Sequence, residues 1–318
     1  MTPWFGRIHR PFDHAGNTPP PLANAALATV RRITIRQEPD AGLDTSTTFH
    51  HQSHMRKFKA IRHVAVTGAV AAILLIAGPV IAGPAAAMAD PGSDCPADPA
   101  MEPLHLPHLR ATIAARSEGL IIAIGSSSTE GAMASDSAHT YPAVLQAALT
   151  KALPTAHFAV VNRGIGGQDA PEELARLDSD AVALHPQLVI WQVGANGAMR
   201  HADPVVFHRM VVEGVTRLRK AGIDVILMDN QRSPRVMAAV DHIVLEESLQ
   251  NVARETRENL FSRSHLMDGW SDEGAKPGLF IASDGLHQND LGYQCVADSL
   301  ARLIVAAIAM PGNLSASR

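Results

Sequence analysis

The sequence has only two cysteines, Cys95 and Cys295, among its 318 residues. No Cys-x-x-Cys pair occurs, so a zinc site or a thioredoxin-like site has no support. A Gly-Lys-Ser/Thr phosphate loop is also absent. The sequence therefore predicts neither a metal nor a cofactor.

Basic residues are scarce in the second part of the chain. Of the 27 Lys and Arg and the 31 Asp and Glu, 9 and 4 precede Asp90, which leaves 18 basic and 27 acidic residues from Asp90 onward. A nucleic-acid-binding surface needs an excess of positive charge. We therefore expect no nucleic-acid partner.

One long stretch, Val64 to Ala89, lacks charged residues altogether. A short basic segment, residues 55–62, precedes it, and it ends in Ala-Met-Ala before Asp90. A basic head, an apolar middle and a small-residue end are typical of a secretory signal, here residues 55–89, with cleavage after Ala89. The alternative is an uncleaved membrane anchor, because 26 residues can span a bilayer. The glycines and prolines of this stretch favour cleavage, so we expect an exported protein, periplasmic or secreted, that is not inserted in the membrane.

An export signal normally begins a chain, yet 54 residues precede this one. Residues 1–54 show no sustained apolar periodicity. We interpret them as a disordered or mis-annotated upstream extension, with Met55 as the true start.

Export also bears on the two cysteines. In an oxidising compartment Cys95 and Cys295 can form a bridge between the N-terminal tail, residues 90–115, and the last helix. The sequence alone leaves open whether they are within reach of each other.

Short apolar runs alternate with longer amphipathic segments from residue 116 to residue 310. Strands are expected at 119–125, 157–161, 188–193, 224–228 and 260–261, and helices at 141–153, 171–184, 203–221, 236–259 and 290–308. This alternation predicts an α/β fold, with a parallel sheet covered by helices on both faces. Ligands bind beyond the carboxyl ends of such strands.

Polar and glycine-rich segments follow three of these strands, and an Asp-x-x-His sequence precedes the last helix. Ser127 follows the first strand and is the candidate nucleophile; His287 is the candidate base, and Asp284 can hold its ring. The backbone N–H groups of Ser127 and Gly167 and the side-chain amide of Asn196 are candidate donors for an oxyanion. Taken singly, each of these residues is more often a plain turn or capping residue.

The four blocks together resemble the SGNH (GDSL-like) hydrolases. The blocks are Gly125-x-Ser127-x-Thr129-x-Gly131, Asn162-x-Gly164-x-x-Gly167, Gly194-x-Asn196 and Asp284-x-x-His287. The resemblance implies a flavodoxin-like, three-layer α/β/α sandwich over residues 116–310. It also implies metal-free esterase or lipase chemistry with a triad of Ser127, His287 and Asp284 and an oxyanion hole of Ser127, Gly167 and Asn196.

This sequence departs from the family pattern around the nucleophile. Ser126 stands where the family has Asp, Ser128 where it has Leu, and Gly197 follows Asn196 where Asp is usual. These positions surround catalytic groups without replacing one, so low activity or an unusual acyl group stays open.

The expected function is an exported serine esterase for short acyl groups, such as acetyl on carbohydrate, with a small-molecule or polysaccharide ester as its partner. The polar segment 266–279, expected to border the cleft, favours carbohydrate over long lipid chains. Alternatives are a lysophospholipase or thioesterase, an acyltransferase, or a non-catalytic carbohydrate-binding protein in which Trp191, Trp270 and Tyr141 hold sugars. A dinucleotide site at Gly164–Gly167 is disfavoured, because Asp169 occupies the place of the third glycine.

Overall fold

The computed structural model describes residues 94–115 and 118–309, and the predictions for residues 1–93, the upstream extension and the signal among them, lie outside that range. Five parallel strands form one sheet in the order β2-β1-β3-β4-β5. They are β1 (Glu118–Gly125), β2 (His157–Gly164), β3 (Leu188–Gln192), β4 (Asp224–Met228) and β5 (Asn259–Phe261). All five predicted strands are present, and the parallel α/β sandwich is confirmed.

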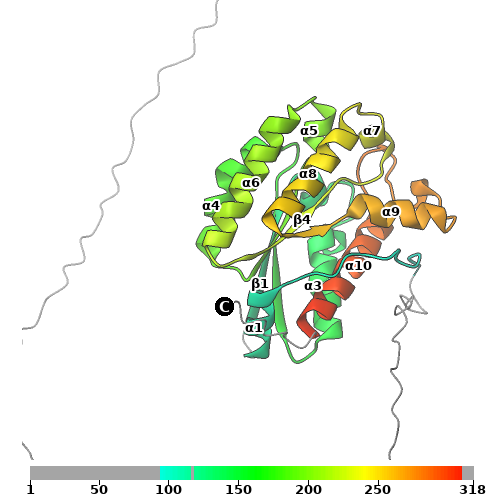
Figure 1. Cartoon of the computed structure of the whole chain (residues 1–318). Coiled ribbons are helices and arrows are strands. Elements are labelled where there is room, and N and C mark those ends of the chain that lie inside the picture. The colour runs from blue at the N-terminus through cyan, green and yellow to red at the C-terminus, as the bar shows by residue number, and fades with distance from the viewer. Residues whose placement is uncertain (1–93, 116–117, 310–318) are drawn as a thin grey trace, which may run out of the picture. The chain divides into compact units, whose positions relative to one another are not determined.

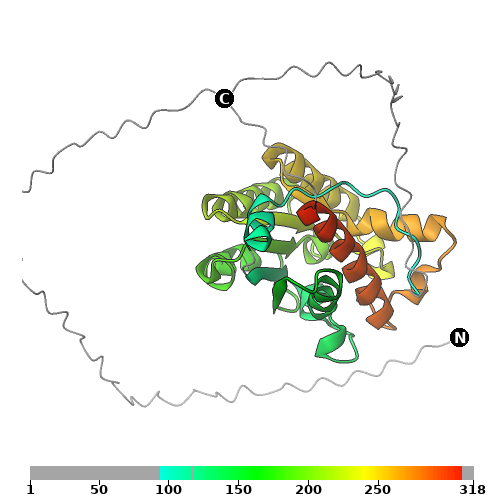
Figure 2. The same ribbon diagram turned by 90° about the horizontal axis from the view of Figure 1, so that it is seen from below.

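The helices form a layer on each face of the sheet (Figures 1 and 2). One layer contains α1 (Pro107–Ala114), α3 (Tyr141–Ala152), α9 (Arg263–Asp272) and α10 (Asp290–Ala309). The other contains α4 (Ala170–Asp180), α6 (Pro204–Lys220) and α8 (His242–Thr256). Short helices α2 (Ser127–Glu130), α5 (Ala195–Met199) and α7 (Pro234–Met237) follow β1, β3 and β4, respectively.

The strand side chains alternate between two apolar cores. In β1, Ile121 and Ala123 point into the core under α3 and α10, whereas Ile122 and Ile124 point into the core under α4 and α6. Successive residues of a strand face opposite sides, so a strand buried on both faces is apolar throughout. For this reason the strand boundaries expected from the apolar runs lie close to those in the structure.

The largest difference between predicted and observed helices lies between residues 234 and 259. The helix expected at 236–259 is interrupted, with α7 ending at Met237 and α8 beginning at His242. The His242 side chain and backbone N–H both bond the carbonyl of Ala239, which closes a turn between the two helices. The sequence prediction missed α1, α9 and the two one-turn helices after β1 and β3.

The segment predicted as an N-terminal tail packs against the domain. Leu104 and Leu106 are buried, and α1 covers part of the core with Leu109. Cys95 forms a disulfide with Cys295 of α10, which answers the question that the sequence left open. The boundary expected at residue 116 is therefore not a boundary of the packed core.

Helix α10 has the length and hydropathy of a membrane-spanning segment. Much of its surface, including Tyr293, Val296 and Leu300, is buried in the core against α3 and α1. Packing inside the domain thus accounts for its apolar composition.

Candidate active site

Ser127 lies at the tight turn from β1 into α2. Gly125 ends the strand, and a Cβ at this position would lie 2.4 Å from Thr129 Oγ1 and 2.8 Å from the Gln192 carbonyl oxygen. Only a glycine allows the chain to turn this closely. The turn places Ser127 as the first residue of α2, partly exposed between its buried neighbours Ser126 and Ser128.

The structure brings the three predicted triad residues together across 160 positions of sequence. Ser127 Oγ lies 2.8 Å from His287 Nε2, and His287 Nδ1 lies 2.6 Å from Asp284 Oδ2. An ionised carboxylate only accepts, so Nδ1 carries the ring proton. Nε2 is then free to accept the proton of the Ser127 hydroxyl.

The Asp284–His287 pair is held by a non-helical turn. Gly285 has φ +68°, a value that glycine adopts without strain. Asp284 Oδ1 accepts the backbone N–H groups of Leu286 and His287 at 2.9 and 3.0 Å. The carboxylate therefore organises the turn as well as the imidazole.

The environment of Asp284 favours its ionised form. Partial burial acts to raise the pKa of this carboxyl, but the hydrogen bonds from the Leu286 N–H, the His287 ring and the His287 N–H together outweigh it. The pKa of Asp284 is consequently lowered from its ordinary value. A charged Asp284 can stabilise the imidazolium that forms when His287 takes a proton.

Gly167, in the loop after β2, and Asn196, the second residue of α5, are joined in one cluster through Gln168. Asn196 Nδ2 donates one hydrogen bond to the Gln168 carbonyl at 2.7 Å, which leaves its second N–H available. Gly167 has φ +78°, and its carbonyl accepts a bond from Arg200 at 2.6 Å. The adjoining Gly166 approaches Ser127, because a Cβ on Gly166 would lie 3.8 Å from the Cβ of Ser127.

Two side chains that the sequence reading missed hold the ends of the strands in this cluster. Gln192, at the end of β3, accepts bonds at its Oε1 from the N–H and hydroxyl of Ser126 and from Thr129 Oγ1. Arg176 of α4 donates to the carbonyls of Gly125 and Arg163 at 2.9 and 2.7 Å. The position of Gln192 after an apolar run could have signalled its place at this edge, whereas Arg176 lies inside a helix and carries no such signal.

The aromatic residues considered as sugar platforms do not serve that purpose. Trp191, Trp270 and Tyr141 are each 0% exposed. Trp191 points into the core, where its indole N–H donates to Glu173. The segment expected to border the cleft begins in α9, whose Leu266, Met267 and Trp270 pack in the core. Residues 271–274 are exposed, so the position of this segment beside a cleft stays a prediction.

Comparisons with known proteins agree with this architecture. The model of the Non-GDSL lipase-like family matches residues 92–310. No curated protein matches the chain.

Solved structures share the fold at low identity. A two-domain esterase (CEX) active on acetylated mannans superimposes with a TM-score of 0.56 and 21% identity, over 66% of this chain and 56% of the esterase. The acetylxylan esterase Axe2 from Geobacillus stearothermophilus has a TM-score of 0.50 and 19% identity, over 61% of this chain and 95% of its own. TesA has a TM-score of 0.50 and 20% identity, over 59% and 99%. The chain thus spans little more than half of the mannan esterase, and this likeness concerns the fold.

Proposed function

Because the chain belongs to the Non-GDSL lipase-like family, we propose that it is an exported serine esterase in which Ser127, His287 and Asp284 form the catalytic triad. Membership in this lipase-like family, together with the fold, makes the chain an SGNH-like hydrolase of ester bonds, as the four sequence blocks predict. The family description also fits the serines that flank Ser127 in place of the usual Asp and Leu.

The observation that carries the proposal is the continuous hydrogen-bonded chain from Ser127 through His287 to Asp284. In the first step the Ser127 oxygen attacks the ester carbonyl while its proton passes to His287 Nε2. The negative charge then develops on the former carbonyl oxygen. The N–H groups of Ser127 and Gly167 and the free N–H of Asn196 are the proposed donors to it.

The same residues complete acylation and then carry out deacylation. The imidazolium returns its proton to the departing alcohol, which leaves an acyl group on Ser127. His287 then takes a proton from water, the hydroxide attacks the acyl carbonyl, and the acid leaves as Ser127 regains its proton. The products are one alcohol and one carboxylic acid.

The proposed substrate is a short acyl ester of a carbohydrate. The rim of the site is charged: the exposed Glu130 carboxylate would be 2.7 Å from a Cβ on Gly166, and Arg200 contacts Gly167. Charged and polar groups suit a hydroxyl-rich alcohol better than an alkyl chain. Two proteins that share the fold are named for activity on acetylated mannans and acetylxylan, which supports the same substrate class here.

A lipolytic activity is the second candidate, because aliphatic side chains are exposed where α6 and α8 begin. Val205, Ile243 and Val244 are 71%, 56% and 44% exposed, and a groove of about 350 Å³ lies between Val205 and Val244. Helices that follow parallel strands begin at the carboxyl edge of the sheet, so this patch lies on the same side as Ser127. A lipid ester would find apolar surface there.

The decisive experiment combines a chain-length series of p-nitrophenyl esters, acetate to octanoate, with acetylated xylo- and manno-oligosaccharides. The carbohydrate proposal expects kcat/KM to be highest for acetyl esters and acetate to be released from the oligosaccharides. Ser127→Ala should remove turnover and covalent labelling by an organophosphate, whereas the matched control Ser126→Ala should retain both. Labelling on Ser126 or Ser128 would contradict the assignment of the nucleophile, and a preference for octanoate would favour the lipolytic candidate.

Export is the remaining part of the proposal. The Cys95–Cys295 disulfide supports it, because such bridges persist in oxidising compartments. The mature protein is expected to begin at Asp90, outside the membrane fraction. Edman sequencing or terminal-peptide mass spectrometry of protein from the native host tests this, and a peptide from residues 1–54 or an uncleaved residue 64–89 segment would contradict it.

A further inference from the structure

The five residues that follow β4, Asp229 to Ser233, are polar and yet largely buried. Asp229, Asn230 and Gln231 are each 1% exposed, and Ser233 is 0% exposed. The proposed reaction uses none of them. Buried polar side chains are costly unless they are bonded, so a run of them at the carboxyl edge of the sheet calls for a physical reason.

Gln231 connects the two halves of the proposed triad. Its Nε2 donates to the carbonyl of Leu286, the residue before His287, at 2.9 Å. Its Oε1 accepts from Arg263 at 2.8 Å and from the hydroxyl of Ser128, the residue after Ser127, at 3.5 Å. Because Arg263 can only donate and a carbonyl can only accept, the amide has one orientation that satisfies both.

Arg263 holds that orientation from inside the core. It is 0% exposed, and its Nε donates to the Asp229 carbonyl at 3.2 Å. Burial lowers the pKa of its guanidinium, opposed by the nearby Asp229 charge. The Gln231 oxygen is therefore one of the few dipoles that compensate this buried cation, which keeps the side chain of Gln231 in place.

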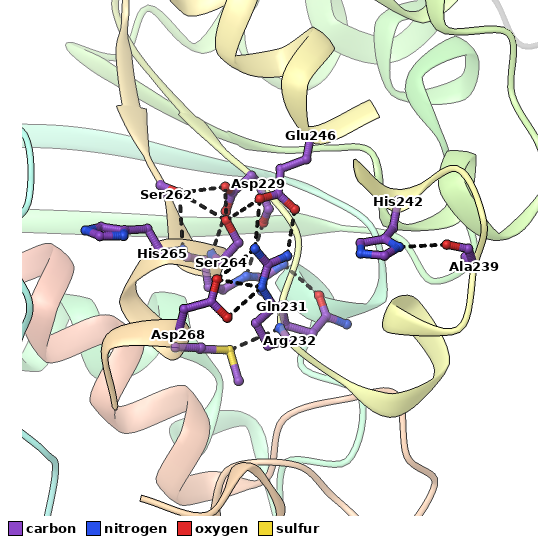
Figure 3. A network of polar contacts seen from close by, with 12 residues as sticks. Asp229, Gln231, Arg232, Ala239, His242, Glu246, Ser262, Ser264, His265 and Asp268 are labelled. Atoms are coloured by element: carbon purple, nitrogen blue, oxygen red, sulfur yellow. Dashed lines mark hydrogen bonds and ion pairs between the residues drawn. The ribbon is translucent and has the colours of Figure 1, made fainter. Parts of the chain in front are cut away.

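The segment itself is anchored on two helices. Arg232 forms bidentate bonds to Asp268 of α9 and to Glu246 of α8, at 2.7–3.0 Å (Figure 3). The Asp229 carboxylate accepts the hydroxyls of Ser262 and Ser264 at 2.8 and 2.6 Å. Ionised, bidentate bonds of this kind are strong and directional, so Gln231 extends from a rigid base.

The turn that carries His287 is attached to this base at two neighbouring points. The Arg235 N–H donates to the Gly285 carbonyl at 3.0 Å, and Gln231 holds the next carbonyl along the chain, that of Leu286. The turn also has its own bond, from the Ala282 N–H to the His287 carbonyl at 2.8 Å. The two contacts from the segment after β4 add to it, and they attach two successive carbonyls of the turn to one rigid base.

We propose that Gln231 is a positioning residue that sets the separation of Ser127 and His287, by holding the His287 turn with its amide N–H and the Ser128 side of the nucleophile turn with its oxygen. This rests on the proposed function in so far as the 2.8 Å contact between Ser127 and His287 is used in catalysis. Gln231 touches no substrate atom in this scheme and acts through the two residues that it spaces.

Two substitutions separate the contacts. Gln231→Met keeps the approximate volume and removes every hydrogen bond, whereas Gln231→Glu keeps an oxygen for Arg263 and places a second oxygen against the Leu286 carbonyl. We expect kcat to fall by about 10²-fold in each, the loss typical of a misplacement of about 1 Å, with KM within about twofold of the wild type. The rate of organophosphate labelling of Ser127 should fall in parallel.

The matched control is Gln187→Met. Gln187 Oε1 accepts the Leu120 N–H at 2.8 Å, so this glutamine also bonds a neighbouring segment, but at the opposite edge of the sheet. Its substitution should lower the melting temperature and leave kcat unchanged. A Gln231 variant that loses only as much activity as the control would show a merely structural role and overturn the proposal.

Crystal structures of the two Gln231 variants test the inference without reference to activity. The Ser127 Oγ to His287 Nε2 distance should lengthen beyond hydrogen-bond range in at least Gln231→Glu. A distance unchanged at 2.8 Å in both variants would overturn the proposal even if the enzyme proves inactive on every ester. Absence of turnover and labelling in the wild type, in contrast, would overturn the proposed function and leave this structural test standing.

Discussion

The carboxyl edge of the sheet and the two faces of the sheet bury different kinds of side chain. At the edge, Gln192, Asp229, Gln231 and Arg263 are buried and bonded to each other or to the loops that carry Ser127 and His287. On the faces, burial is almost entirely aliphatic and aromatic. We infer that the apolar faces stabilise the fold, whereas the polar edge sets the distances between residues of the proposed site.

Among the exceptions on the faces is the pair of Glu173 and Trp191. Glu173 is 1% exposed, and it accepts the Trp191 indole N–H at 2.8 Å. Among the described residues, neither side chain of this pair is hydrogen-bonded to Ser127, His287 or Asp284. Substitutions in this buried polar pair should therefore change stability alone, whereas substitutions of the buried polar residues at the edge should also change activity.

The largest expected effect comes from removing His287, the proposed base. His287→Ala should lower kcat by about 10⁴-fold or more, since truncated triads typically lose this much. Because His287 is partly exposed, the melting temperature should change little. Turnover of p-nitrophenyl acetate and a thermal melt measure the two quantities, and a variant that retains the wild-type rate would remove His287 from its assigned role.

Loss of the disulfide should lower stability and leave activity almost unchanged, the opposite of the His287 substitution. The double substitution Cys95→Ala, Cys295→Ala opens a cross-link between residues 200 positions apart and should destabilise the protein by about 2–5 kcal/mol. Activity at low temperature should persist, because the bridge joins the N-terminal segment to α10 and touches no triad residue. Urea unfolding measures the loss, with the reduced wild-type protein as the control; equal midpoints for oxidised and reduced protein would contradict the prediction.

The smallest expected effect concerns pH and the Glu173–Trp191 pair. Burial raises the pKa of Glu173 to about 8, although the bond from Trp191 opposes the shift. Between about pH 4.5 and about pH 8 the unfolded chain releases this proton while the folded chain keeps it, so the free energy of unfolding should fall as pH rises through this window.

Glu173→Gln removes the titrating group while keeping an oxygen for the indole N–H. The variant should lose that part of the pH dependence, measured by urea unfolding at pH 5 and pH 9, with kcat unchanged. If the free energy of unfolding depends on pH in the same way in the wild type and the variant, Glu173 is not buried in its protonated form.

The strands were predictable because their signal is local. A parallel strand buried on both faces is apolar at every position, so runs such as residues 119–125 and 224–228 stand out by themselves. Helix α9 was missed because it mixes buried Arg263, Ser264 and Trp270, and no apolar stripe of ordinary pattern results.

The residues of the proposed site were predictable from the sequence, whereas the side chains that hold them in place were not. Ser127, Gly167, Asn196, Asp284 and His287 each stand in a short block that the resemblance identifies. The partners of Gln231, in contrast, lie 32, 55 and 103 positions away, at Arg263, Leu286 and Ser128. Nothing in the local pattern around Gln231 indicates which of these segments it meets.

The amino-acid sequence by itself determined the alternation of strands and helices and the family blocks, because apolar periodicity and tight glycine turns are properties of a few neighbouring residues. The tertiary structure alone decided that Cys95 reaches Cys295, that three aromatic side chains are buried, and that a glutamine after β4 bonds both the Leu286 carbonyl and the Ser128 hydroxyl. Those facts depend on how helices pack over the sheet, and packing joins residues whose separation along the chain carries no information about their distance in space.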